Sequence, residues 1–136
     1  MPTSITLPQL PVSFMNEDHE HARHMLERMM ALLSEPGTDA GELGKACRAF
    51  LEHNREHFGR EEAAMQATGF PPYPVHQSEH KNALSWLERL TIQAETAPES
   101  ESLRRAILDE LPAWYLRHIQ TMDAVTANWI DAHSTG

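Results

Sequence analysis

Apolar side chains recur at every third or fourth position along four stretches of the chain, with polar side chains between them. This is the period of an α-helix that buries one face, and it predicts helices over about 16–34, 39–68, 74–96 and 99–131. Residues 1–13 contain three prolines and no such period, so we expect an extended arm on the surface. The inward line of the first helix comprises Phe14, Met15, His19, Ala22, Leu26, Met29 and Leu33. That of the last helix comprises Leu103, Ile107, Leu111, Trp114, His118, Met122, Val125 and Trp129.

Capping residues and helix breakers indicate where these helices begin and end. Asn16, followed by two acidic residues, has the features of an N-cap for the first helix. Asp39 with Glu42 three residues later forms a capping-box pattern at the start of the second helix, and Gly69 supplies its stop. Pro112 falls inside the last stretch, so we expect a kink there or a division into two pieces.

Four amphipathic helices joined by short connections are typical of an antiparallel four-helix bundle with up-down-up-down topology. No stretch of the sequence shows the alternation of a β-strand, and no internal repeat appears. A chain of 136 residues is long enough for one well-covered core. The sequence therefore predicts an all-α fold and a single domain over residues 1–136.

The composition narrows the partners and the chemistry. A net charge of −9 argues against nucleic acid and against an anionic membrane surface as partners. A single cysteine, Cys47, excludes an internal disulfide and a metal site built from several thiolates. Residues 1–12 carry no basic residue and no apolar run, so we expect neither a signal peptide nor a membrane anchor, and a cytoplasmic location.

The nine histidines are unusual, and each predicted helix places at least one of them on its inward line. Two acidic residues, Glu61 and Asp123, accompany them, and Glu61 lies one helical turn after His57. Imidazole and carboxylate ligands without sulfur suit iron or manganese and tolerate zinc. Seven such groups exceed the needs of one ion, so two ions bridged by the carboxylates fit better. The candidate ligands are His19, His57, Glu61, His76, His80, His118 and Asp123.

One of these residues has an awkward spacing. Asp123 follows His118 by five residues, which on a regular α-helix rotates it by about 140° away from the histidine. Either Asp123 reaches the site from the flank of the helix, or a local π-type bulge turns it inward.

The order of these motifs resembles that of the hemerythrins, and most closely the single-domain bacterial hemerythrins, over roughly residues 14–130. The resemblance rests on a lone histidine in the first helix and on three further motifs. These are His57-Phe58 with Glu61-Glu62 and Met65, His76 with His80 after an aromatic–proline loop, and His118-Ile119 with Asp123.

The resemblance implies reversible dioxygen binding, for storage, delivery or sensing, at a non-haem di-iron centre. His76, His80 and His118 would hold one iron, while His19 and His57 would hold the other, which keeps an open position for dioxygen. Glu61 and Asp123 would bridge the two irons together with an oxo or hydroxo group. We further expect a monomer that is not an enzyme, with an unidentified oxygen-consuming protein as a candidate partner.

Other functions stay open at this point. The same site would serve a di-iron oxidase or peroxidase, or an enzyme that handles nitric oxide. The segment from His76 to His80 also matches the inverted zinc-protease pattern with Glu79 as base, but the other inward histidines would then have no role. A bundle whose histidines are only structural would need many hydrogen-bond partners in an apolar seam.

Several residues are expected around the ligands rather than among them. By spacing alone His53 and His57 could form the ligand pair, but we expect His53 to support the site from outside. Trp114 and Met122 are expected beside the centre in the same way. Thr126 stands where hemerythrins often carry a tyrosine, and His21, His24 and His133 are expected to face solvent.

Overall fold

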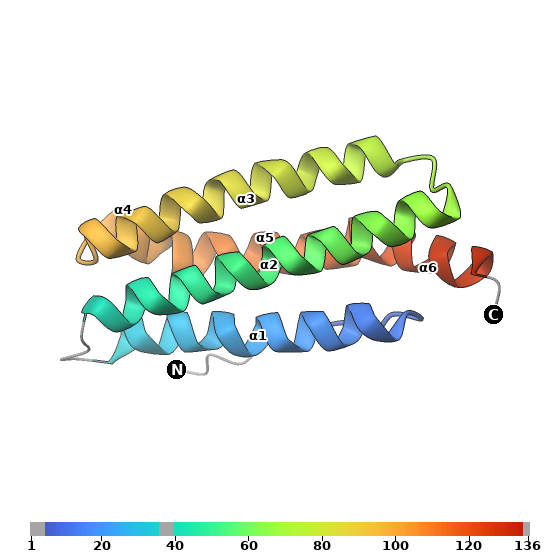
Figure 1. Ribbon diagram of the computed structural model, residues 1–136. Coiled ribbons are helices and arrows are strands. Elements are labelled where there is room, and N and C mark those ends of the chain that lie inside the picture. The colour runs from blue at the N-terminus through green and yellow to red at the C-terminus, as the bar shows by residue number, and fades with distance from the viewer. Residues whose placement is uncertain (1–4, 36–39, 135–136) are drawn as a thin grey trace.

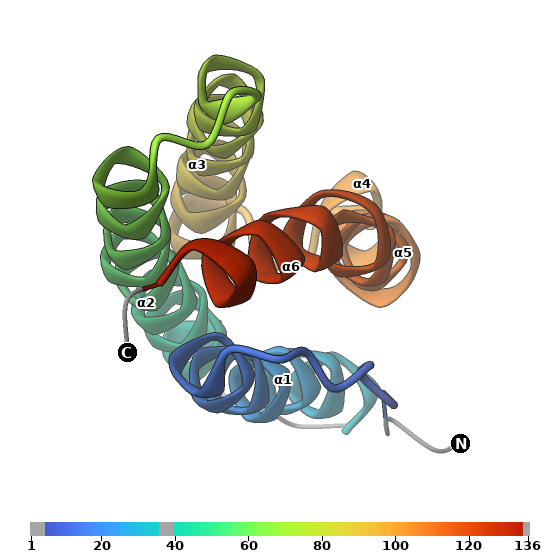
Figure 2. The same ribbon diagram turned by 90° about the vertical axis from the view of Figure 1, so that its right-hand side faces the viewer.

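The computed structural model describes residues 5–35 and 40–134, which form an antiparallel four-helix bundle (Figures 1 and 2). This confirms the predicted all-α fold. The first three helices of the bundle are α1 (Ser13–Ser34), α2 (Ala40–Thr68) and α3 (Tyr73–Thr96). The fourth runs from α4 (Glu101–Arg105) through α5 (Leu111–His118) to α6 (Ala124–His133), with π-helical turns at Ala106–Glu110 and Ile119–Asp123. Consecutive helices run in opposite directions, as the colour gradient in Figure 1 shows.

The first helix begins at Ser13, three residues before the predicted cap at Asn16. Asn16 instead holds the arm: its side chain accepts a hydrogen bond from the Leu10 N–H (2.9 Å) and donates one to the Leu10 carbonyl (2.7 Å). The actual N-cap, Val12, makes no side-chain capping bond, and the first turn contains no acidic residue. At the end of α2, Gly69 has the expected left-handed backbone, with φ of +67°. The Asp39 half of the predicted capping box lies outside the described residues.

Residues 5–12 follow the surface of the bundle as an arm without regular secondary structure. The Ile5 N–H donates to the Glu27 carboxylate (2.7 Å), and Ile5, Leu7 and Leu10 pack against the core. The apolar side chains of the arm therefore explain why it stays on the bundle without being helical.

Two apolar clusters fill the bundle and leave a polar region between them. The larger cluster is built on residues such as Leu26, Phe50 and Ile107, all fully buried, and it contains the buried Cys47. The smaller cluster comprises Met15, Ala127 and Ile130 at the opposite end of the bundle. Each fully buried large side chain contributes about 1.5–3 kcal/mol to folding. The region between the clusters holds the predicted ligands.

The fourth helical segment departs from a regular α-helix in the two π turns. In these turns the Leu111 N–H bonds the Ala106 carbonyl, and the Ala124 N–H bonds the Ile119 carbonyl, five residues back in each case. The irregularity expected at Pro112 thus takes the form of a wide turn directly before the proline, and the segment then continues as helix.

The extra residue in the second π turn shifts the buried face by one position. Asp123, Thr126 and Ile130 are buried where Met122, Val125 and Trp129 were predicted. The prediction of an inward Val125 was wrong, since that side chain is 57% exposed. The same shift turns Asp123 inward, which is the π-bulge alternative that its spacing left open.

Candidate metal centre

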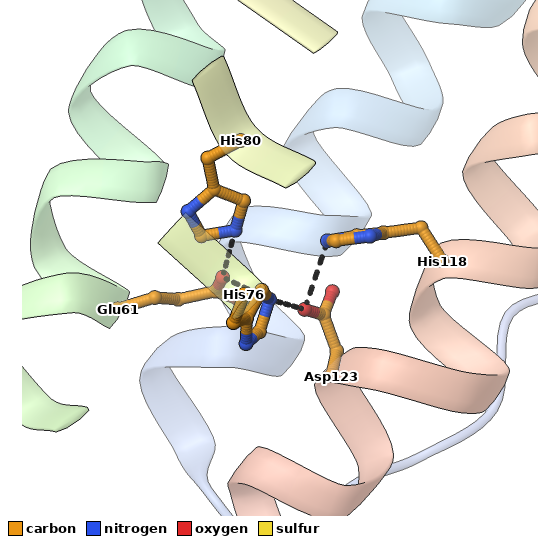
Figure 3. Close-up of side chains that lie close together, drawn as sticks. All are labelled: Glu61, His76, His80, His118 and Asp123. Carbon is orange, nitrogen blue, oxygen red and sulfur yellow. Dashed lines mark ion pairs between the residues drawn. The ribbon is translucent and has the colours of Figure 1, made fainter. Parts of the chain in front are cut away.

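The seven predicted ligand residues meet between the two apolar clusters, and none of them is more than 3% exposed. α1 supplies one of them, α2 and α3 supply two each, and the end of α5 and the second π turn supply the last two. Figure 3 shows five of these side chains pointing toward one another from α2, α3 and the fourth segment. The seven are His19, His57, Glu61, His76, His80, His118 and Asp123.

Five of the side chains form a first group around one point. Asp123 Oδ1 lies 3.1 Å from Nε2 of both His76 and His118, and Glu61 Oε1 lies 3.1 Å from Nε2 of His80 (Figure 3). Donor atoms of the five lie within 4.8 Å of one another. Ligand atoms bound at about 2.1 Å to one octahedral ion lie about 3 Å apart, so this spacing suits a metal.

The second group contains His19 and His57 together with the same two carboxylates. His57 Nε2 is 2.8 Å from Glu61 Oε2, and His19 Nε2 is 2.9 Å from Asp123 Oδ2. Each carboxylate therefore turns one oxygen toward the first group and the other toward the second. With this orientation each carboxylate could contact an ion in either group.

The candidate ligand atoms of these residues are better placed to bind metal ions than to form hydrogen bonds with one another. Most of them are fully enclosed and have no partner in hydrogen-bonding geometry, although neighbours lie near. An unpaired buried polar group costs about 1–3 kcal/mol, and coordination of a cation removes that cost. The unpaired ligand atoms are Nε2 of His57, His76, His80 and His118, both carboxylate oxygens of Glu61, and Asp123 Oδ1.

Three of the five histidines are oriented from behind by a polar side chain. Each donates its Nδ1–H outward, so that the neutral imidazole presents its Nε2 lone pair to the centre. The pairs are His57 with Asp18 Oδ2 (2.9 Å), His80 with Glu62 Oε2 (2.8 Å) and His76 with Thr126 Oγ1 (2.7 Å).

Sequence reasoning did not assign this supporting role to Asp18, Glu62 or Thr126. Asp18 and Glu62 each directly adjoin a predicted ligand in the sequence. That adjacency was the available signal for a supporting carboxylate. No such signal existed for Thr126, because the π turn decides that it faces inward.

The electrostatics of the metal-free centre also favour cations. Burial opposes the charged form of His57, but Glu61 and Asp18 outweigh it and raise the His57 pKa to about 10. Burial likewise opposes ionisation of Asp123, yet the facing histidines, His118 first, hold its pKa well below the ordinary value. Without metal the two carboxylates thus retain protons on neighbouring imidazoles, and metal binding must release those protons.

The residues expected around the ligands are close to them. His53 lies outside the ligand cluster: its Nε2–H donates to the Asp18 carbonyl (2.9 Å), and its ring stacks parallel to His57 at 6.3 Å. Trp114 stacks on His118 at 4.9 Å. Met122 lines a cavity of about 180 Å³ beside His76.

Histidines that were expected to face solvent do so in the structure. His21 and His24 on α1 and His133 on α6 are exposed. Glu79, which the zinc-protease pattern requires as a base, is not part of the ligand cluster.

Comparison with known proteins points to one family. A sequence model of the hemerythrin HHE cation-binding domain matches residues 10–130. A bacteriohemerythrin of Ralstonia nicotianae is 35% identical over 85 residues, which cover 62% of this chain and only 61% of that protein. A bacteriohemerythrin of Aquifex aeolicus is 24% identical over 114 residues, covering 84% of this chain and 86% of that protein.

Solved structures show the same fold. The crystal structure of a hemerythrin mutant superposes with a TM-score of 0.81 at 20% identity, covering 94% of this chain and 98% of that one. A second mutant structure gives 0.78 at 21% identity, covering 89% of each chain. Within residues 5–35 and 40–134, no helix is both long enough and apolar enough to cross a bilayer.

Proposed function

We propose, from the premise that the chain belongs to the hemerythrin family, that it binds dioxygen reversibly at a pair of iron ions. The observation that carries this proposal is the sharing of Glu61 and Asp123 between two groups of buried donors. A site for one ion does not require two carboxylates that each direct one oxygen to one group of ligands and the other oxygen to a second group.

The two groups differ in the number of ligands that they offer. His76, His80 and His118 would hold one iron together with both carboxylates, which gives five protein donors. His19 and His57 would hold the other with the same carboxylates, which gives four. We therefore assign the open position to the His19–His57 side. When bound, the iron pair supplies the electrons and the coordination position that dioxygen needs.

The protein's own residues make this centre suitable for holding dioxygen rather than for converting it into a product. The hydrogen bonds that Asp18, Glu62 and Thr126 accept hold three imidazoles in one tautomer and one orientation. Phe58 is buried and stacks on the His80 ring at 3.9 Å, and the apolar clusters close the bundle on both sides of the centre. Exclusion of bulk water slows irreversible oxidation of the centre.

The test is an optical experiment on iron-loaded protein with the iron counted per chain. The reduced protein is exposed to oxygen and then purged with argon. Two irons per chain and a ligand-to-iron charge-transfer band that vanishes on purging would support a reversible carrier. Two irons with rapid, irreversible oxidation would instead favour a di-iron oxidase or peroxidase. A chain that binds no iron would refute the proposal.

A further inference from the structure

The phenol of Tyr115 is a buried polar group that the proposed metal site does not use. Among the described residues, the enclosed side-chain polar atoms without a hydrogen-bond partner belong to the seven proposed ligands, with one exception. That exception is the hydroxyl of Tyr115, whose side chain is 2% exposed. Leaving a buried hydroxyl unpaired destabilises the folded protein, so its retention needs an explanation.

The position of Tyr115 connects it to the side of the centre with fewer ligands. Tyr115 lies on α5, one turn before His118. Its ring meets the His19 ring edge-on at 6.2 Å and also meets Phe50 at 6.3 Å. His19 belongs to the four-donor group that carries the proposed open position. The phenol therefore lies beside the part of the centre that a small molecule would enter.

The hydroxyl is available as a hydrogen-bond donor. A phenol ionises only at alkaline pH, so at neutral pH the proton stays on the oxygen. The buried hydroxyl of Thr126 differs, because His76 already bonds to it. A protonated hydroxyl without a protein acceptor is free to bond to a ligand at no cost to the existing network.

We propose that Tyr115 donates a hydrogen bond to the small exogenous ligand held at the His19–His57 side of the centre. This inference rests on the proposed function for its iron centre, and it does not require that dioxygen binding be reversible. The ligand class is a small anion, or a small molecule that gains negative charge when it binds to iron. Tyr115 thereby raises the affinity of the centre for such ligands, and it is a binding residue rather than a metal ligand.

The experiment is a titration of the oxidised, iron-loaded protein with azide, a small linear anion that gives a visible band with ferric iron. Tyr115→Phe removes the hydroxyl and keeps the ring. We expect it to weaken azide binding roughly tenfold or more, as expected for loss of a hydrogen bond to a charged group. The infrared stretch of bound azide should shift in D₂O in the wild type, and this shift should be lost or reduced in the variant.

A matched control and a readout without iron accompany the titration. Tyr73→Phe removes the other tyrosine hydroxyl of the chain, which bonds Gln66 and Gln77, and it should leave azide affinity unchanged. In the metal-free protein, Tyr115→Phe should melt at the same temperature as the wild type or higher, because it removes an unpaired buried hydroxyl.

Three results would overturn the inference. The first is azide affinity of Tyr115→Phe within twofold of the wild type. The second is a lower melting temperature of the metal-free variant, which would mean that the hydroxyl has a partner within the protein. The third is a D₂O shift of the bound azide stretch that is unchanged in Tyr115→Phe, which would assign the hydrogen bond to another donor. A wild type that binds azide as expected but oxidises irreversibly in oxygen would refute the proposed function and leave this inference standing.

Discussion

Replacement of Asp18 by asparagine tests whether the carboxylate behind His57 sets the strength of the metal site. Asp18 Oδ2 accepts hydrogen bonds from His57 Nδ1 (2.9 Å) and from Arg60 Nε (2.8 Å). Asparagine keeps an acceptor oxygen of similar size but removes the charge. The substitution therefore separates the electrostatic contribution of Asp18 from its shape.

The expected loss of folding stability follows from the pKa of Asp18. Burial opposes ionisation of this group, but His57 and Arg60 outweigh it and lower its pKa from 3.8 to about 2. At about 1.4 kcal/mol per unit this difference corresponds to about 2 kcal/mol of folding stability. The Arg60 side chain is 45% exposed, so solvent screens its share and about 1–2 kcal/mol remains.

The sign of the pH dependence is determined by the direction of that shift. A lowered pKa means that the stabilisation is present above the unfolded value of 3.8 and is lost as the pH falls through about 2. Metal-free Asp18→Asn should therefore unfold in urea about 1–2 kcal/mol more easily than the wild type at pH 7. The difference in unfolding free energy between the two proteins should disappear as the pH falls from about 4 to about 2.

Iron affinity is the second readout. Loss of a carboxylate that orients a ligating histidine typically costs 10- to 100-fold in metal affinity, and we expect about tenfold here, because asparagine still accepts a hydrogen bond. Competition with a ferrous chelator measures it. Glu20→Gln, a carboxylate-to-amide change at an exposed position on α1, is the matched control and should leave iron affinity unchanged. Wild-type iron affinity and an unchanged acid profile in Asp18→Asn would refute the reasoning.

Four further predictions follow from the same contacts. Thr126→Val removes the acceptor behind His76 and should weaken iron retention about tenfold in a chelator competition, whereas Thr126→Ser should retain it. His53→Ala should keep two irons per chain in elemental analysis, and loss of one would make His53 a ligand. Phe50→Ala should cost about 3–5 kcal/mol in urea unfolding, because the side chain is fully buried in the larger cluster; a cost below 1 kcal/mol would contradict that. Removal of iron should lower the melting temperature in calorimetry, because ligands from all four helical segments lose their common partner; equal melting of both forms would argue against it.

The sequence by itself determined the fold class and the candidate ligands. The 3.6-residue period of apolar side chains is a local property, so it revealed four helices and their buried faces, except after the second π turn of the fourth segment. Histidines and acidic residues on those buried faces stood out because burying them without a partner is costly. His19, His57 and Glu61, for example, could be selected without knowledge of how the helices pack.

Tertiary structure decided the features that depend on the spatial relation between helices. Asp123 and Thr126 face inward only because a π turn adds one residue to the turn before them, and a regular period places Met122 and Val125 there instead. Asp18 on α1 supports His57 on α2, although the two residues are 39 positions apart in the sequence. No periodic pattern in the chain links these two positions.

The unpaired hydroxyl of Tyr115 likewise depends on the tertiary structure. Whether a buried polar atom finds a partner depends on every helix around it, and a local pattern contains no information on that. The sequence thus specified which faces of the regular helices are buried, because hydrophobic periodicity is local. The packed bundle specified which polar atoms meet, because hydrogen bonds and metal coordination depend on distances between residues far apart in the chain.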